Sequence, residues 1–208
     1  MCIRDRGYEA RNDLPEGFIA GIVGNYAARP DGAWQRLERG EILLDEFCRI
    51  FDSEIANLGY SVSTAAMMLE MADFVVVRPR MLEAVRRLRA HGIKTAALTN
   101  NWLMEEKDLE REALESEFDA FIESCRTGLR KPDPRIYELT CEALGILPGE
   151  AAFLDDLGAN LKAAARLGML TIKVTDPDVA LRELGVAMGI ELVDPPPADT
   201  GSGEETET

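Results

Sequence analysis

The chain has 208 residues, which is enough for one α/β domain with a small insert. Its formal net charge is −15, from 38 acidic and 23 basic residues, and no stretch is rich in Lys and Arg. Because nucleic acids and anionic membranes bind concentrated positive charge, the composition argues against both as partners, and no apolar run approaches the ~20 residues of a membrane-spanning helix.

The first 76 residues divide into a short leader and a helical region. Residues 1–6, MCIRDR, show no helix, strand or signal-peptide pattern and resemble a translated sequencing or assembly scar, so they are left out of the fold reasoning. In residues 7–76, apolar side chains recur at steps of three and four, which predicts buried helical faces. Helices are expected at residues 33–39, 43–57 and 63–74.

Residues 77–193 alternate between helical and strand patterns. Strands are expected at residues 93–98, 118–122, 151–154 and 170–174, and helices at 80–91, 105–117, 134–144 and 159–167. Asp176 and Pro177 predict the start of a last helix, because Asp is favoured at the N-cap and Pro at the first helical position. Alternating βα units predict a parallel sheet with helices on both faces and strand ends that converge on one edge.

The end of the chain and its cysteines add two expectations. Residues 194–208 are rich in Pro, Gly and acidic residues, which predicts a disordered tail or linker. Cys2, Cys48, Cys125 and Cys141 show no C-x-x-C spacing. We interpret them as reduced residues and expect a cytoplasmic protein.

Two adjacent acids follow the strand expected at residues 151–154. Asp155 and Asp156 stand on a Gly-containing turn that opens a helix. Open α/β sheets bind ligands at the carboxyl ends of their strands, and magnesium prefers carboxylate oxygens. A solvated turn that begins a helix would have the same spacing, so this pair alone does not decide for a metal site.

Two other polar stretches point to the same edge of the sheet. Thr99, Asn100 and Asn101 follow the strand expected at residues 93–98, and a hydroxyl, an amide and backbone N–H groups can bind phosphate oxygens; the alternative is an ordinary polar turn. Lys131 lies in GLRKPDP, where two prolines restrict the backbone. Its ammonium would neutralise phosphate charge, and the alternative is a surface lysine in a rigid turn. Trp102 would line the mouth of the site or pack between the helical region and the sheet.

The order of these motifs resembles a known superfamily. Strand-Thr-Asn, then Lys-Pro-Asp-Pro, then strand-Asp-Asp-x-Gly-x-Asn resemble the second, third and fourth motifs of the haloacid dehalogenase-like (HAD) hydrolases. Residues 78–193, including LTNNW, FIESCRTGLRKPDPRIY and FLDDLGANLKAAARLGM, are similar to the N-terminal phosphatase domain of soluble epoxide hydrolase and to the corresponding domain of the acyl-CoA dehydrogenase family member 10 type. The resemblance implies an α/β fold with a Rossmann-like parallel sheet as the core, residues 77–193. Residues 7–76 would be an N-terminal α-helical cap that closes over the site, or else a helical subdomain packed for stability.

The resemblance also implies a magnesium-dependent phosphatase. In that superfamily an Asp attacks the phosphoryl group and gives an aspartyl-phosphate that water hydrolyses, while Mg2+ screens the charges. Carried over, Thr99 and Asn100 would bind the phosphoryl group of a small-molecule phosphate ester, and Lys131 would balance its charge. Asp156 would be the direct Mg2+ ligand, and Asp155 would support it directly or through water. Hydrolytic dehalogenation uses the same fold, but the Asp155–Asp156 pair speaks against it.

The first motif of the superfamily, an apolar strand followed by the nucleophile motif Asp-x-Asp, is not found in the sequence. Asp176-Pro177-Asp178 has the spacing but lies after the Asp-Asp motif, where we interpret it as a helix start. We therefore expect an N-terminally truncated chain that lacks the first core strand and is nearly inactive by itself. The alternative is a non-catalytic phosphate-binding or scaffolding domain of a larger multidomain protein.

Overall fold

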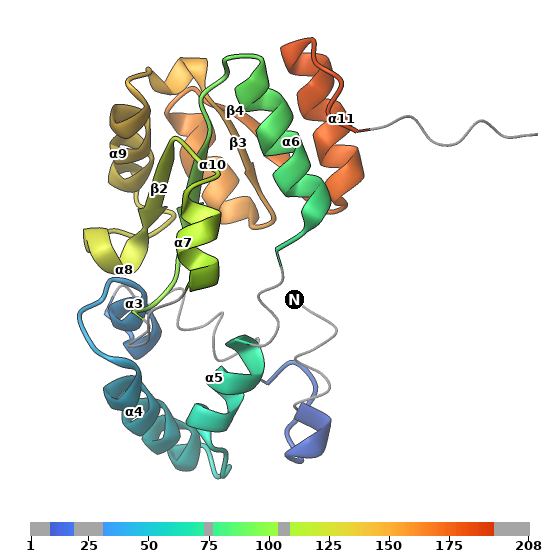
Figure 1. Cartoon of the computed structure of the whole chain (residues 1–208). Coiled ribbons are helices and arrows are strands. Elements are labelled where there is room, and N and C mark those ends of the chain that lie inside the picture. The colour runs from blue at the N-terminus through green and yellow to red at the C-terminus, as the bar shows by residue number, and fades with distance from the viewer. Residues whose placement is uncertain (1–8, 19–30, 73–76, 104–108, 194–208) are drawn as a thin grey trace, which may run out of the picture.

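The computed structural model describes residues 9–18, 31–72, 77–103 and 109–193, as a helical region next to an α/β region (Figure 1). The expectations for residues 1–6 and 194–208 lie outside these ranges, as do the last residues of the helix expected at 63–74 and the first residues of the one expected at 105–117. No helix within the described ranges combines the length and the apolar character needed to cross a membrane.

The helical region contains α3 (Ala33–Glu38), α4 (Leu44–Asn57) and α5 (Thr64–Ala72), as the apolar spacing predicted. The apolar faces of these helices meet in one cluster, in which Phe47 and Phe51 are 0% exposed. Asp52 joins α4 to α5, because its Oδ1 accepts hydrogen bonds from the backbone N–H of Thr64 at 2.8 Å and from its hydroxyl at 2.6 Å. This region therefore has a closed apolar core of its own.

The α/β region follows the predicted alternation. In chain order it contains α6 (Pro79–Ala90), β1 (Ala96–Thr99), α7 (Leu109–Glu115), β2 (Ala120–Glu123), α8 (Ser124–Thr127), α9 (Pro134–Leu144), the 3-10 helix η1 (Pro148–Glu150), β3 (Ala152–Asp155), α10 (Gly158–Arg166), β4 (Leu170–Lys173) and α11 (Pro177–Met188). The short helices α8 and η1 have no expected counterpart, because neither is long enough to show an apolar period. β1 begins later than expected, because the backbone N–H of Thr95 donates to the carboxylate of Asp119 (2.8 Å).

The helix start expected at Asp176 is confirmed. Asp176 is the N-cap of α11, and its Oδ1 accepts a hydrogen bond from the backbone N–H of Val179 at 2.9 Å, while Pro177 occupies the first turn. The carboxylate of Asp178 forms an ion pair with Arg80 of α6. The Asp-Pro-Asp segment therefore caps a helix and joins α11 to α6.

The four strands pair in parallel, as predicted, but in two separate two-stranded sheets. β1 pairs with β2, with Ala96 opposite Ala120, and β3 pairs with β4, with Ala152 opposite Leu170. Among the described residues no strand pairing joins the two sheets. The expectation that the chain lacks the first core strand stays a prediction, because residues 1–8 and 19–30 lie outside the described ranges.

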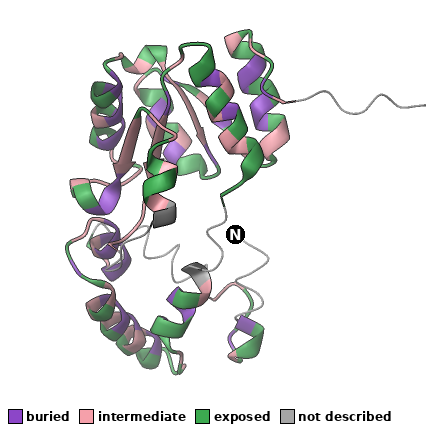
Figure 2. Ribbon diagram, viewed as in Figure 1, coloured by how far each residue is buried: buried purple, intermediate pink, exposed green. Residues whose placement is uncertain are grey.

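Helices cover both faces of these strands (Figure 1). On one face α6 and α11 pack with Leu154 of β3, and on the other face α9 and α10 pack with Phe153 of β3 and Leu98 of β1. Strands covered on both faces are normally buried. Here every residue of β1 and the first three residues of β3 are only half-buried (Figure 2). The first three residues of β2 are half-buried as well, so the strands are not fully covered.

The helical region meets the α/β region through two close contacts. Gly40 has φ 68°, and a Cβ at this position would lie 2.2 Å from the carbonyl oxygen of Cys125. The Nε of Arg130 lies 2.5 Å from Oε2 of Glu38, and the two side chains are 16% and 10% exposed. These contacts hold α3 against α8 and against the loop that follows α8.

Candidate active site

The predicted site residues lie at the carboxyl ends of two strands and in one loop between them. Thr99 is the last residue of β1, and Asp155 is the last residue of β3. Lys131 lies in the loop between α8 and α9. Because β1 and β3 belong to different sheets, the loop is the part of the chain that connects their ends.

Lys131 is fixed to the end of β1 by two hydrogen bonds from one side chain. The backbone N–H of Lys131 donates to Oδ1 of Asn100 at 2.9 Å, and Nδ2 of Asn100 donates to the carbonyl oxygen of Lys131 at 3.0 Å. The carboxamide of Asn100 therefore binds both backbone groups of one residue. This arrangement sets the position from which the lysine side chain projects.

The same lysine reaches the end of β3. Its Nζ lies 2.8 Å from Oδ2 of Asp155, and the two side chains are only 12% and 5% exposed. The carboxylate of Asp155 also accepts hydrogen bonds from the backbone N–H of Leu157 (2.8 Å) and from Nδ2 of Asn160 (3.0 and 3.1 Å). A buried carboxylate is stable only when its charge and lone pairs are compensated. Lys131, Leu157 and Asn160 supply that compensation.

Tyr137 of α9 supports this network from behind. Its hydroxyl donates to the carbonyl oxygen of Asn160 at 3.0 Å, and its ring packs edge-on against Phe153 with centroids 5.2 Å apart. Burial and the nearby negative charge of Asp155 raise the pKa of Tyr137 far above its ordinary value of 10.0. The phenol therefore stays protonated and acts as a hydrogen-bond donor.

Asp156 differs from its neighbour Asp155. It is exposed, and within the described part of the chain it has no hydrogen bond or ion pair. Its oxygens are therefore free for a ligand, whereas those of Asp155 are already occupied by protein donors. Magnesium commonly binds through one or two carboxylates, with water and phosphate oxygens completing its shell. Asp156 fits such a partial set as the one carboxylate of the pair with available oxygens, although the described residues contain no cluster of three acidic, His or Cys side chains.

The side chains of Thr99 and Asn101 differ in whether other described residues already bind them. Within the described ranges no hydrogen bond to the Thr99 side chain is found, so its hydroxyl can donate to an anion. Nδ2 of Asn101 donates to the buried carboxylate of Glu123 at 2.7 Å, and its backbone N–H donates to Oγ of Ser124 at 3.0 Å. Arg111 also pairs with Glu123, at 2.9 Å. Asn101 therefore anchors the turn after β1.

Trp102 packs toward the helical region, which is one of its two expected positions. Its ring lies 6.4 Å from that of Trp34 in an edge-on arrangement, and it is partly buried against the apolar cluster of α3, α4 and α5. Trp34 in turn donates from Nε1 to Glu38 (3.0 Å), the residue that pairs with Arg130. The helical region thus contacts the residues directly after Asn101 and directly before Lys131.

Several residues of this network were not identified from the sequence. Asn160 belongs to the Asp-Asp-x-Gly-x-Asn motif, so its spacing from Asp155 was a usable signal. Glu123 follows an apolar strand run, and besides the nearby Arg126 its partners Asn101 and Arg111 lie 22 and 12 positions away. Glu38 ends the short helix α3, and its pairing with Arg130 spans 92 positions. No local pattern marks contacts of that kind.

The chain matches a family model and several curated proteins. Residues 9–168 match the model of the haloacid dehalogenase-like hydrolases. Acyl-CoA dehydrogenase family member 10 of Mus musculus is 39% identical over 189 residues, which cover 89% of this chain and 18% of that protein. Bifunctional epoxide hydrolase 2 of Sus scrofa is 37% identical over 205 residues, with coverages of 90% and 36%. The chain thus spans a minor part of either protein.

A shorter relative and a solved structure match this chain over most of their own length. A sesquiterpene phosphatase of Aspergillus oryzae is 28% identical over 157 residues, covering 75% of this chain and 79% of that protein. A HAD family enzyme of Bacteroides thetaiotaomicron, solved in complex with magnesium and inorganic phosphate, is 25% identical, with a TM-score of 0.51 and coverages of 70% and 75%. The family model covers well over half of the chain, and the α/β architecture agrees with it. The chain belongs to the haloacid dehalogenase-like hydrolase family.

Proposed function

We propose that the site is that of a magnesium-dependent phosphatase for small-molecule phosphate esters. The observation that carries this proposal is the position of Lys131, which is held at the end of β1 by Asn100 and ion-paired at the end of β3 with Asp155. Thr99 ends β1 and Asp156 directly follows β3, and neither side chain has a partner among the described residues. A fixed cation, a hydroxyl donor and a carboxylate pair are the groups that phosphate and a hard divalent ion require.

Each residue has a distinct proposed role. The hydroxyl of Thr99 would donate to a phosphate oxygen, and the ammonium of Lys131 would balance the phosphate charge. Asn100 belongs to the phosphate site and, in addition, positions Lys131 through its carboxamide. Asp156 would bind Mg2+ directly, and Asp155 would support it while keeping Lys131 in place. When bound, Mg2+ would lower the repulsion between the phosphate and the carboxylates.

The proposed reaction proceeds through an aspartyl-phosphate. An Asp oxygen forms a bond to phosphorus while the bond from phosphorus to the ester oxygen breaks, and the leaving alkoxide takes up a proton; water then cleaves the acyl phosphate. The printed sequence contains no Asp-x-Asp ahead of Thr99. We therefore propose that these residues bind phosphate but turn over slowly by themselves, because loss of a nucleophile costs several orders of magnitude in rate.

The proposed function also gives a role to each part of the chain. Residues 7–76 would be the cap, residues 77–193 the catalytic core and residues 194–208 a linker. The described cysteines Cys48, Cys125 and Cys141 are free and buried, which supports a reducing, cytoplasmic location. The substrate and any further activity of the long relatives do not transfer with the fold.

Binding and turnover test the proposal separately. Inorganic phosphate should bind the chain in a titration calorimeter more tightly with Mg2+ than without it, and Lys131→Met should weaken binding about tenfold or more. Lys162→Met, an exposed lysine on α10, is the matched control and should leave binding unchanged. A protein in which an apolar strand ending in Asp-x-Asp precedes this sequence should hydrolyse a generic aryl phosphate only with Mg2+. Phosphate binding without turnover in that protein would favour the scaffolding alternative.

A further inference from the structure

Two adjacent basic residues, Arg130 and Lys131, are each held by a carboxylate from a different region of the molecule. Nε of Arg130 lies 2.5 Å from Oε2 of Glu38, the last residue of α3. Nζ of Lys131 lies 2.8 Å from Oδ2 of Asp155, the last residue of β3. The four side chains are at most 16% exposed. The helical region thus fixes this segment through Arg130, and the α/β region fixes it through Lys131.

The carboxylate of Glu38 is itself held by the core of the helical region. Its Oε1 accepts a hydrogen bond from Nε1 of Trp34 at 3.0 Å. Trp34 is buried and packs edge-on against Phe47, with centroids 5.5 Å apart. Because closely packed interiors permit little displacement of their side chains, Glu38 provides a fixed anchor for Arg130.

The position of Arg130 determines that of the Lys131 backbone. The carbonyl oxygen of Arg130 accepts a hydrogen bond from the backbone N–H of Asp133 at 2.9 Å, which closes a turn with Lys131 as its second residue. The carboxamide of Asn100 binds the N–H and the carbonyl oxygen of Lys131 within that turn. Release of the Arg130 side chain would therefore free one end of the turn that presents Lys131.

We infer that Glu38 is a positioning residue of the phosphate site, which acts through Arg130 to keep the ammonium of Lys131 at the strand ends. The inference rests on the proposed function, in which Lys131 balances the charge of the phosphate. Glu38 holds the neighbouring cation, Arg130, on the side of the helical region. Lys131 is thereby the one of the two cations that reaches the carboxyl end of β3.

The sign of the effect separates positioning from simple electrostatics. Glu38→Gln removes a negative charge and the anionic partner of Arg130, so Coulomb attraction alone predicts tighter binding of phosphate. Positioning predicts the opposite, a loss of affinity of about fivefold or more. Asp52→Asn is the matched control, because it removes the same charge from another hydrogen-bonded carboxylate of the helical region. It should leave phosphate affinity unchanged.

Calorimetric titration of the full chain with inorganic phosphate and Mg2+ measures these affinities, in the parent chain and in Lys131→Met. The loss caused by Glu38→Gln should disappear in the Lys131→Met background, because Glu38 acts through that lysine. An equal loss in both backgrounds would overturn the inference, as would unchanged or tighter binding by Glu38→Gln. If Glu38→Gln does not fold, the double variant Glu38→Gln/Arg130→Met, which removes both charges of the pair, should show the same loss.

Amide hydrogen exchange without phosphate tests the inference apart from the proposed function. Glu38→Gln should speed exchange of the Lys131 N–H, which donates to Asn100, by about tenfold, whereas Asp52→Asn should leave its rate unchanged. A parent chain that binds no phosphate would contradict the proposed function, and the exchange rate would still decide whether Glu38 holds Lys131 in place. An unchanged rate in Glu38→Gln would overturn the inference.

Discussion

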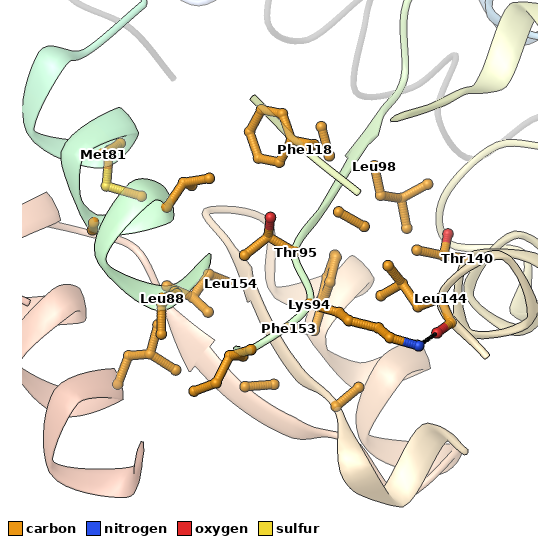
Figure 3. A pocket seen from close by; sticks show the side chains of 18 of the residues that line it. Met81, Leu88, Lys94, Thr95, Leu98, Phe118, Thr140, Leu144, Phe153 and Leu154 are labelled. Atoms are coloured by element: carbon orange, nitrogen blue, oxygen red, sulfur yellow. Dashed lines mark hydrogen bonds between the residues drawn. The ribbon is translucent and has the colours of Figure 1, made fainter. Parts of the chain in front are cut away.

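The helical region and the α/β region are held together in different ways. In the helical region the aromatic side chains of Phe47 and Phe51 stack with centroids 5.1 Å apart and are fully buried. In the α/β region the central strands β1 and β3 remain half-buried, and polar contacts at their ends, above all Lys131 with Asp155, connect the two sheets. Apolar clusters thus pack in both regions, but in the α/β region they leave a cavity along β1 and β3 (Figure 3), and polar contacts link the ends of these strands.

This difference in packing indicates which region can accommodate a ligand. A fully packed core tolerates little change, because even small changes in side-chain volume are felt. The α/β region keeps groups available for ligands, because among the described residues no pairing joins β1 to β3 and no partner binds the carboxylate of Asp156. Each of the following experiments tests one side of this contrast, and they run from the largest expected effect to the smallest.

Truncating one phenylalanine in each region compares the two kinds of packing directly. Phe51→Ala should lower the free energy of unfolding by about 4 kcal/mol, because it leaves a cavity in a closed core. Phe153→Ala should lower the free energy of unfolding by about 2 kcal/mol, because this side chain already borders an apolar cavity along β1 and β3. Urea denaturation followed by circular dichroism measures both. Equal losses would show that the centre of the sheets is as tightly packed as the helical core.

Removing Lys131 tests the polar connection between the sheets. Lys131→Met should destabilise by about 3 kcal/mol, because it leaves the buried carboxylate of Asp155 without its cation. Adding Asp155→Asn to that variant should recover part of the loss, as expected for a coupled pair. Lys162→Met is the exposed control and should change stability by less than about 0.5 kcal/mol. Additive losses from the two substitutions would contradict the coupling.

Substituting two glycines compares the junction between the two regions, at Gly40, with an ordinary turn, at Gly59. Gly59→Ala should cost about 1 kcal/mol, since Gly59 has φ 86° but no atom within 4 Å of the added Cβ. Gly40→Ala should cost more than about 2 kcal/mol, because its Cβ would also collide with the carbonyl oxygen of Cys125. Thermal unfolding of the two variants gives the difference. Similar midpoints would mean that the contact between α3 and α8 is loose.

The smallest effect concerns the polar contact that precedes β1. The backbone N–H of Thr95 and the nearby Arg89 lower the pKa of Asp119 below its ordinary value of 3.8. A lowered folded-state pKa stabilises above the unfolded value, and this contribution is lost as the pH falls below about 4. The stability difference between the parent chain and Asp119→Asn should therefore be larger at pH 6 than at pH 3, in urea titrations. Asp45→Asn, on the exposed side of α4, controls for the change in net charge. A constant difference across this range would contradict the role of Asp119.

Much of the fold could be predicted because its signals are local. The apolar periods placed every helix and strand expected within the described ranges to within a few residues, and Asp176 was correctly interpreted as an N-cap. The motifs likewise placed Thr99 and Asp155 at strand ends, and the loop residue Lys131 reaches both of these ends. The start of β1 was placed too early, because a side chain distant in sequence, Asp119, takes the hydrogen bond of Thr95.

The sequence proposed the members of the candidate site but not the contacts among them. The sequence treated Asp155 and Asp156 as a pair, whereas the structure buries one among three donors and leaves the other exposed. It placed Asn100 at the phosphate site without showing that its carboxamide holds Lys131. It gave no role to Glu38, whose partner lies 92 positions away.

By itself the sequence determined which segments form the longer helices and the strands, to within a few residues, and which polar residues stand at the strand ends, because these properties depend on neighbours a few positions apart. Within the described residues, tertiary structure alone decided that the strands separate into two sheets, that Lys131 joins the ends of β1 and β3, and that the carboxylate of Asp156 has no protein partner. Those outcomes depend on which groups distant in sequence come into contact, and such long-range contacts produce no periodic pattern in the sequence.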